Sequence, residues 1–93
     1  NGLRQLVDNL KNKMKSGVVV LGGLADGKAS FIAGVTSDLI SRVKAGDIVK
    51  QTAVLAGGSG GGRPDLALAG GKESGKIDEA LRAVPGILEK LIS

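Results

Sequence analysis

Apolar residues recur at helical spacing near both ends of the chain. Over residues 2–15 they return every three or four positions with charged residues between them, which predicts an amphipathic helix. The same period over 75–92 predicts a closing helix, which Pro85-Gly86 should break or kink because proline lacks the N–H and clashes with the preceding turn. A further helix is expected over about 46–56, after a short turn or helix over 37–42. Its predicted core-facing residues are Ile48, Val49, Ala53 and Val54.

Short apolar runs between these helices predict β-strands. The β-branched run Val18–Leu21 is typical of a buried strand, and residues 29–35 are its expected partner in a hairpin with a longish connection that includes Asp26-Gly27. Residues 65–69 should add a strand, with Pro64 at its start because proline donates no ladder hydrogen bond. This order of elements predicts an α+β fold, a small mixed β-sheet packed with helices.

The hairpin region contains a string similar to a phosphate-binding loop. Gly22 to Lys28 matches G-x-x-x-x-G-K, but Ala29 follows where a P-loop has the Ser or Thr that holds Mg²⁺. A P-loop also opens a helix whose N-terminus meets the phosphates, whereas the residues after Lys28 have the pattern of a strand. We therefore interpret the string as part of the hairpin.

Composition narrows the chemistry that the chain can perform. Its 93 residues include no Cys and no His, which excludes disulfides, His-dependent acid–base catalysis and Cys/His zinc sites. The 13 basic and 9 acidic residues give a net charge of +4, which suits a polyanion partner and equally an ordinary solvated surface. No apolar stretch approaches the ~18 residues of a membrane span, so no membrane partner is expected.

The segment from Gly57 to Gly71 is the most informative part of the sequence. It is rich in glycine yet carries Arg63-Pro64-Asp65 and a short apolar stretch, so it is not a Gly/Ser linker. Glycine is needed where φ is positive or where another group approaches the main chain closely, and successive glycine N–H groups can bind an anion. The run is therefore either an elaborate turn between packed elements or a surface on which another backbone sits.

Residues 60–71, GGGRPDLALAGG, closely resemble the G-G-G-R-P-D-x-A-Q-A-G-G signature of the C-terminal domain of bacterial alanyl-tRNA synthetases. The flanks agree, and the resemblance covers about residues 30–92. Two positions depart from the family: Leu68 stands where Gln is common, and Ser59 where a basic residue is frequent. The family domain, called C-Ala, belongs to the DHHA1 superfamily. The resemblance implies a DHHA1-like fold for residues 17–93, with 1–16 as the end of a helical linker.

The resemblance also implies a function. The domain should recognise the tRNA(Ala) elbow by shape and backbone contacts and help couple aminoacylation with editing in a cytoplasmic enzyme. Its implied partners are that elbow, the aminoacylation and editing domains of the same chain and, in some members, a second copy. ATP, Mg²⁺ and Zn²⁺ are implied for the parent enzyme, whereas no cofactor and no catalytic residue is expected here. Since the chain starts inside a helical pattern without Met, we expect it to be part of something longer.

Candidate RNA contacts combine backbone groups with positive charge. Glycine N–H groups can approach a sugar–phosphate surface that side chains would block, and Arg63 can hold a phosphate bidentately. The candidate contacts are Gly60, Gly61, Gly62, Arg63, Lys44, Lys50 and Lys72. A turn for the glycines and an ion pair within Arg63-Pro64-Asp65 stay open as structural alternatives. Structural roles in the loop are expected for Pro64, Asp65, Gly70 and Gly71, the last two as a turn.

Two other functions stay open at this point. One is the nucleic-acid-binding domain of a DHH-type phosphoesterase, although those relatives usually carry a His in the glycine motif and this chain has none. The other is a dimerisation domain, which predicts an exposed apolar patch on the first or last helix. With Phe31 expected in the core and no Trp or Tyr, the chain lacks platforms for stacking single-stranded bases, which favours recognition of folded RNA by shape.

Overall fold

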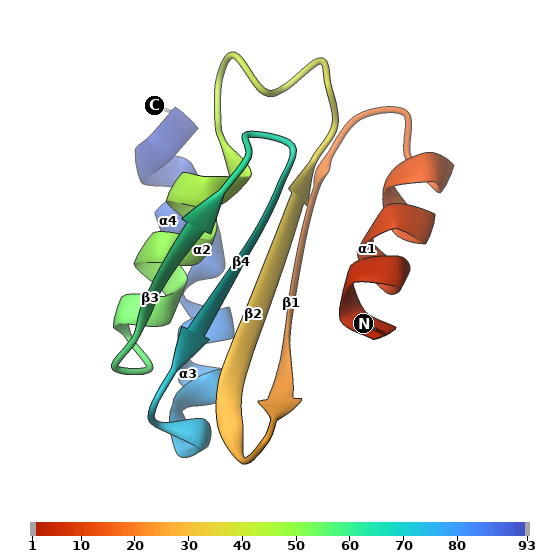
Figure 1. Ribbon diagram of the computed structural model, residues 1–93. Helices are drawn as coiled ribbons and strands as arrows, with labels where there is room; N and C mark the ends of the chain where they lie inside the picture. The colour runs from red at the N-terminus through yellow and green to blue at the C-terminus, as the bar shows by residue number, and fades with distance from the viewer. Residues whose placement is uncertain (1, 93) are drawn as a thin grey trace.

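The computed structural model describes residues 2–92, with side chains from Arg4 onward, so the outermost residues of the predicted segments 1–16 and 17–93 lie outside it. A four-stranded sheet in the order β1-β2-β4-β3 forms the centre of the molecule, and its helices pack on both faces (Figure 1). The elements are α1 (Gly2–Lys13), β1 (Val18–Ala25), β2 (Lys28–Val35), α2 (Ala45–Val54), β3 (Ser59–Gly62), β4 (Leu66–Gly71), the 3₁₀ turn η1 (Ser74–Lys76), α3 (Ile77–Arg82) and α4 (Val84–Ile92).

The predicted α+β class is confirmed, but the sheet is antiparallel throughout rather than mixed. Strands β2 and β3, which are joined through helix α2, run in the same direction. Strand β4 lies between them and is antiparallel to both. The parallel pair that a β-α-β segment usually forms is therefore split by the following strand, which is why no parallel neighbours exist among the described residues.

The β1–β2 hairpin is tighter than expected. Its register runs from Val18↔Val35 to Ala25↔Lys28, so only Asp26 and Gly27 form the turn. Both have positive φ, 53° and 78°, the conformation of the type I′ turn that suits the right-handed twist of paired strands. The expected longish connection is thus wrong, and the P-loop-like string lies in a strand, a turn and the start of the next strand, with no helix after it.

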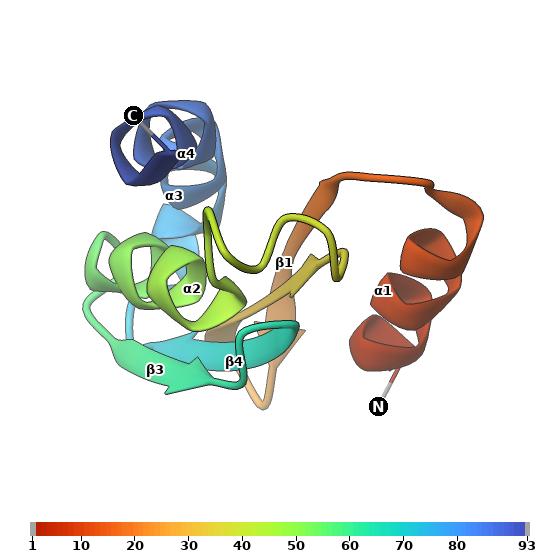
Figure 2. The ribbon, with the colours of Figure 1, turned by 90° about the horizontal axis from the view of Figure 1, so that it is seen from above.

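The two faces of the sheet carry separate apolar clusters. Helices α2, α3 and α4 cover one face, and α1 lies on the other (Figure 2). On the first face Phe31 is fully buried, as predicted, among small residues of β2 and β4 and the inner side of α2. On the second face α1 packs over β1 and β2 through a smaller cluster. Its buried members are Val7, Val19, Ile32 and Leu66.

Two details of the helices differ from the periodic pattern. In α2, Thr52 is fully buried and its Oγ1 donates to the Ile48 carbonyl at 2.7 Å, whereas Val54, predicted to face inward, is 61% exposed. Val54 is the last residue of the helix, where the chain turns away from the sheet. At the C-terminus the predicted break is confirmed, since α3 ends at Arg82 and α4 starts at Val84. Pro85 lies in the first turn of α4, where its missing N–H has no intrahelical partner to lose.

Candidate nucleic-acid interface

The glycine run does not form the loop that was expected; its middle forms the edge strand β3, paired with β4 from Ser59↔Gly70 to Gly62↔Ala67. Helix α2 ends just before it in a Schellman motif. Gly57 adopts φ +74° and its N–H donates to Val54 O, while the Gly58 N–H donates to Ala53 O. Glycine is a poor strand former, so β3 depends on its backbone pairing with β4 and on its packing against α2.

Alternate glycines of β3 have opposite roles. Gly60 and Gly62 pair with the buried Ala69 and Ala67 on the face that α2 covers. A Cβ on Gly60 would overlap the Ala69 side chain, and a Cβ on Gly62 would lie 3.0 Å from Ala67 Cα. From the helix side, a Cβ on Gly46 would lie only 3.1 Å from Gly62 O. Gly46 lets the α2 backbone approach β3, and Gly60 and Gly62 leave room for the neighbouring strand β4, so the fold itself requires these glycines.

Gly61 and Gly70 lie on the other face, and the fold does not require glycine at either position. A Cβ on Gly61 would meet nothing within 4 Å, and one on Gly70 would make an ordinary contact 3.6 Å from Ala29 O. Neither residue has positive φ. Leu68, the cross-strand partner of Gly61, is 39% exposed beside them. Because α1 packs on β1 and β2, this half of the face over β3 and β4 is left open (Figure 2).

The tip of the β3–β4 hairpin is fixed by its own carbonyl groups. Pro64 O accepts the Ala45 N–H at 2.8 Å, and Asp65 O accepts the Val35 N–H at 2.9 Å. Asp65 O also accepts from Lys11 Nζ at 3.0 Å, which joins α1 to the tip. At the same tip, Arg63 Nε lies 3.4 Å from Asp65 Oδ1, and both side chains are exposed. The ion-pair alternative therefore exists in the structure, and an exposed pair of this kind leaves Arg63 accessible to solvent.

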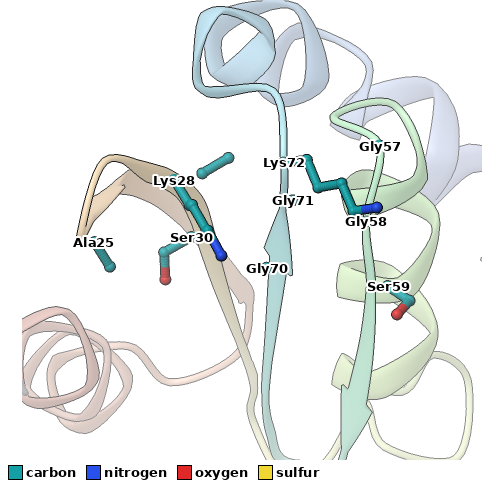
Figure 3. A pocket seen from close by; sticks show the side chains of 10 residues that line it. Ala25, Lys28, Ser30, Gly57, Gly58, Ser59, Gly70, Gly71 and Lys72 are labelled. Atoms are coloured by element: carbon teal, nitrogen blue, oxygen red, sulfur yellow. The ribbon is translucent and has the colours of Figure 1, made fainter.

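The predicted cations do not form one cluster. Lys44 directly precedes α2, next to the Pro64 contact, and so shares the hairpin-tip end with Arg63. Lys50 is exposed on α2, and Lys72 follows β4 at the opposite end of the sheet. There it lines a shallow concavity of about 620 Å³ (Figure 3).

Gly70 and Gly71 end strand β4 rather than forming the expected turn. Gly71 is buried, and a Cβ there would lie 2.6 Å from Ala56 O, so close packing explains it. The concavity also includes Lys28, Ser30 and Ser59, which sequence reasoning did not select. Lys28 lies within the P-loop-like string, and its place at this concavity follows from the pairing of β2 with β4, which no local sequence pattern indicates.

Comparison with known proteins gives consistent matches. Residues 1–90 match the DHHA1 domain family. Curated relatives include the alanine–tRNA ligases of Idiomarina loihiensis, 61% identical over 85% of this chain and 9% of that protein. The ligase of Chromohalobacter salexigens is 55% identical over 94% of this chain and 10% of that protein. The chain thus spans about a tenth of the length of these relatives.

A solved structure agrees with these matches. The C-Ala domain from Aquifex aeolicus alanyl-tRNA synthetase superposes with a TM-score of 0.83 at 35% identity, covering 92% of this chain and 78% of that one. The chain belongs to the DHHA1 domain family, and within it to the C-Ala domains of alanyl-tRNA synthetases.

Within residues 2–92 no three His, Cys, Asp or Glu side chains gather as a group that could hold a metal ion. None of the helices in that range combines the length and apolar character that crossing a bilayer requires.

Proposed function

We propose that this C-Ala domain binds tRNA(Ala) at its elbow, reading shape and backbone rather than sequence, and thereby helps couple aminoacylation with editing. On this proposal it acts beside the aminoacylation and editing domains of a longer cytoplasmic chain. ATP, Mg²⁺ and Zn²⁺ would serve those other domains.

The observation that carries the proposal is the open half of the sheet face. Gly61 and Gly70 sit there without any steric reason to be glycine. A surface without side chains lets the rigid sugar–phosphate backbone of a folded RNA approach the protein main chain. The cations at the two ends of this face, Arg63 at one and Lys72 at the other, suit the two edges of such a contact.

The lack of exposed aromatic residues supports shape reading. Phe31 is fully buried, and the sequence has neither Trp nor Tyr. Sequence-specific RNA binding to single strands relies on stacking of splayed bases on aromatic or arginine planes, whereas folded RNA is recognised through phosphates and 2′-OH groups. A flat glycine surface with basic ends suits the second mode.

The test is binding of the 93-residue chain to tRNA(Ala), to an unrelated tRNA and to a minihelix without the elbow, across a salt series. Binding to both tRNAs but not to the minihelix is the expected result, because the elbow shape is common to tRNAs. Equal binding to the minihelix would overturn elbow recognition. The log–log salt slope then reports the number of phosphates neutralised.

The dimerisation alternative has weaker support. Among the described residues, the large exposed apolar side chain of α1 is Leu6 and that of α4 is Ile92. The helices lie on opposite faces of the sheet (Figure 2), and each carries one such side chain among the described residues rather than the patch that this alternative predicts. Absence of tRNA binding at low salt together with a concentration-dependent mass would favour assembly over RNA binding.

A further inference from the structure

Two lysines, Lys28 and Lys72, line the concavity at the end of the open face that is remote from Arg63. The last β2–β4 pair at this end is Ala29↔Gly71, and Lys28 and Lys72 are the next residue beyond it on each segment. Both lie on the rim of the 620 Å³ concavity. In Figure 3 the Lys28 side chain extends over the gap between β2 and β4, and that of Lys72 extends toward β3.

Among the described residues, neither Lys28 nor Lys72 is held in an ion pair. The pairs Arg63–Asp65 and Lys76–Glu79 use other cations. The carboxylate of Glu73 lies beside Gly57, which also lines the concavity, since a Cβ on Gly57 would be 3.1 Å from Glu73 Oε2. That carboxylate is not paired with Lys28 or Lys72, so both ammonium groups can contact an added anion.

The floor of the concavity provides neutral donors for the same anion. Ser30, Gly70 and Ser59 form one row across β2, β4 and β3, because Gly70 pairs with both serines. Ser30 and Ser59 both line the concavity, and a serine hydroxyl can donate a hydrogen bond. Gly70 between them adds no side chain, and its backbone is in an ordinary conformation. The site therefore combines two ammonium groups, two hydroxyls and an unobstructed floor.

We propose that this concavity, the Lys28/Lys72 site, binds a phosphodiester group of the RNA backbone. The inference rests on the proposed function and adds a second anchoring point to it. Strand β4 has six residues, which at about 3.3 Å each separates this site from the hairpin tip by roughly 20 Å. A single nucleotide does not span that distance, whereas a folded RNA lying across the glycine face contacts both ends.

The site also explains the P-loop-like string in a different way. Its lysine, Lys28, reaches a phosphate from the first position of a strand rather than after a loop that opens a helix. The glycines of the string lie in β1 and the turn and take no part in the contact.

The first test uses Lys28→Ala and Lys72→Ala in the salt series with tRNA(Ala), with Lys76→Ala as the matched control because Lys76 already pairs with Glu79. All three lysines are exposed, so the variants should fold. Each of the first two should weaken binding about three- to tenfold and reduce the log–log salt slope by about one, and the control should change neither. An unchanged slope in both variants, with normal tRNA binding, would overturn the site and leave the proposed function standing.

A second measurement separates failure of the site from failure of RNA binding. Pyrophosphate is titrated into the labelled domain while backbone amide resonances are followed by NMR. We expect shifts at Ser30, Ser59 and Gly70 that disappear in the Lys28→Ala/Lys72→Ala double variant. If the chain binds no tRNA, these shifts still establish an anion site; their absence in the wild type refutes it.

Discussion

The two faces of the sheet use the same small residues for opposite purposes. On the covered face, a Cβ on Gly60 or Gly62 would press against the neighbouring strand β4, and one on Gly46 of α2 would press against β3. On the open face, Gly61 and Gly70 have room for a side chain, yet none is present. Neighbouring glycines of β3 thus differ, because the fold requires glycine at positions 60 and 62 but not at position 61. Where it does not, a ligand that needs a bare backbone is the physical explanation we propose.

The largest contrast between the faces should appear when one large side chain is removed from each. Phe31→Ala empties a fully buried site beneath α2 and should lower the free energy of unfolding by about 3–5 kcal/mol. Leu68→Ala, on the open face where the side chain is 39% exposed, should cost about 1 kcal/mol or less. Denaturant unfolding of both variants measures the difference. Similar losses would mean that the open face is packed as part of the core.

A second contrast lies within β3 itself. Gly60→Val places its side chain into Ala69 and should destabilise the domain by about 3 kcal/mol. Thermal and urea unfolding, compared with the wild type, measure this loss. A Gly60→Val domain of wild-type stability would show that β3 and β4 are not packed at this position as closely as the structure gives.

A smaller effect concerns the hydrogen bonds that link residues 16–17, which follow α1, to residues 36–38, which follow β2. Hydrogen bonds from the side chains of Ser16 and Thr36 lower the pKa of Asp38 below its ordinary value of 3.8. Thr36 Oγ1 donates to Asp38 Oδ1 at 2.6 Å and accepts the Gly17 N–H at 3.0 Å. Because the folded-state pKa is depressed, the carboxylate stabilises the fold above pH 3.8, and this contribution is lost as pH falls through the lowered value.

Asp38→Asn should therefore be slightly less stable than the wild type at neutral pH, and the gap should close in acid. Unfolding curves at pH 7 and at pH values below 3.8 test this. A constant difference in stability across that range would show that the charge of Asp38 does not strengthen these hydrogen bonds.

Local patterns predicted most elements because those elements satisfy local rules. The amphipathic periods of α1 and α4, the turn at Asp26-Gly27 and the break near Pro85 each depend on residues close together in sequence. The signature around Gly61 marked the candidate site, although the sequence did not predict that these glycines form a strand. RNA contact at any of these residues stays a prediction.

The remaining features depend on contacts between distant segments. Strand β3 forms from glycines through pairing with β4 and packing on α2, neither of which glycine propensity indicates. The antiparallel sheet follows from the insertion of β4 between β2 and β3. Lys28 and Lys72 become neighbours only through the β2–β4 register, and no pattern within either segment specifies that register.

The central claim is that Gly61 serves a ligand rather than the fold, and Gly61→Val tests it directly. Valine suits an exposed edge strand and has space there, so the free energy of unfolding should stay within about 0.5 kcal/mol of the wild type. Gly86→Val, at an equally open position on α4, is the control for bulk alone. We predict that tRNA affinity falls about tenfold or more in Gly61→Val and is unchanged in Gly86→Val, because only the first side chain blocks the approach of the RNA backbone. Wild-type affinity in a folded Gly61→Val domain would contradict the account.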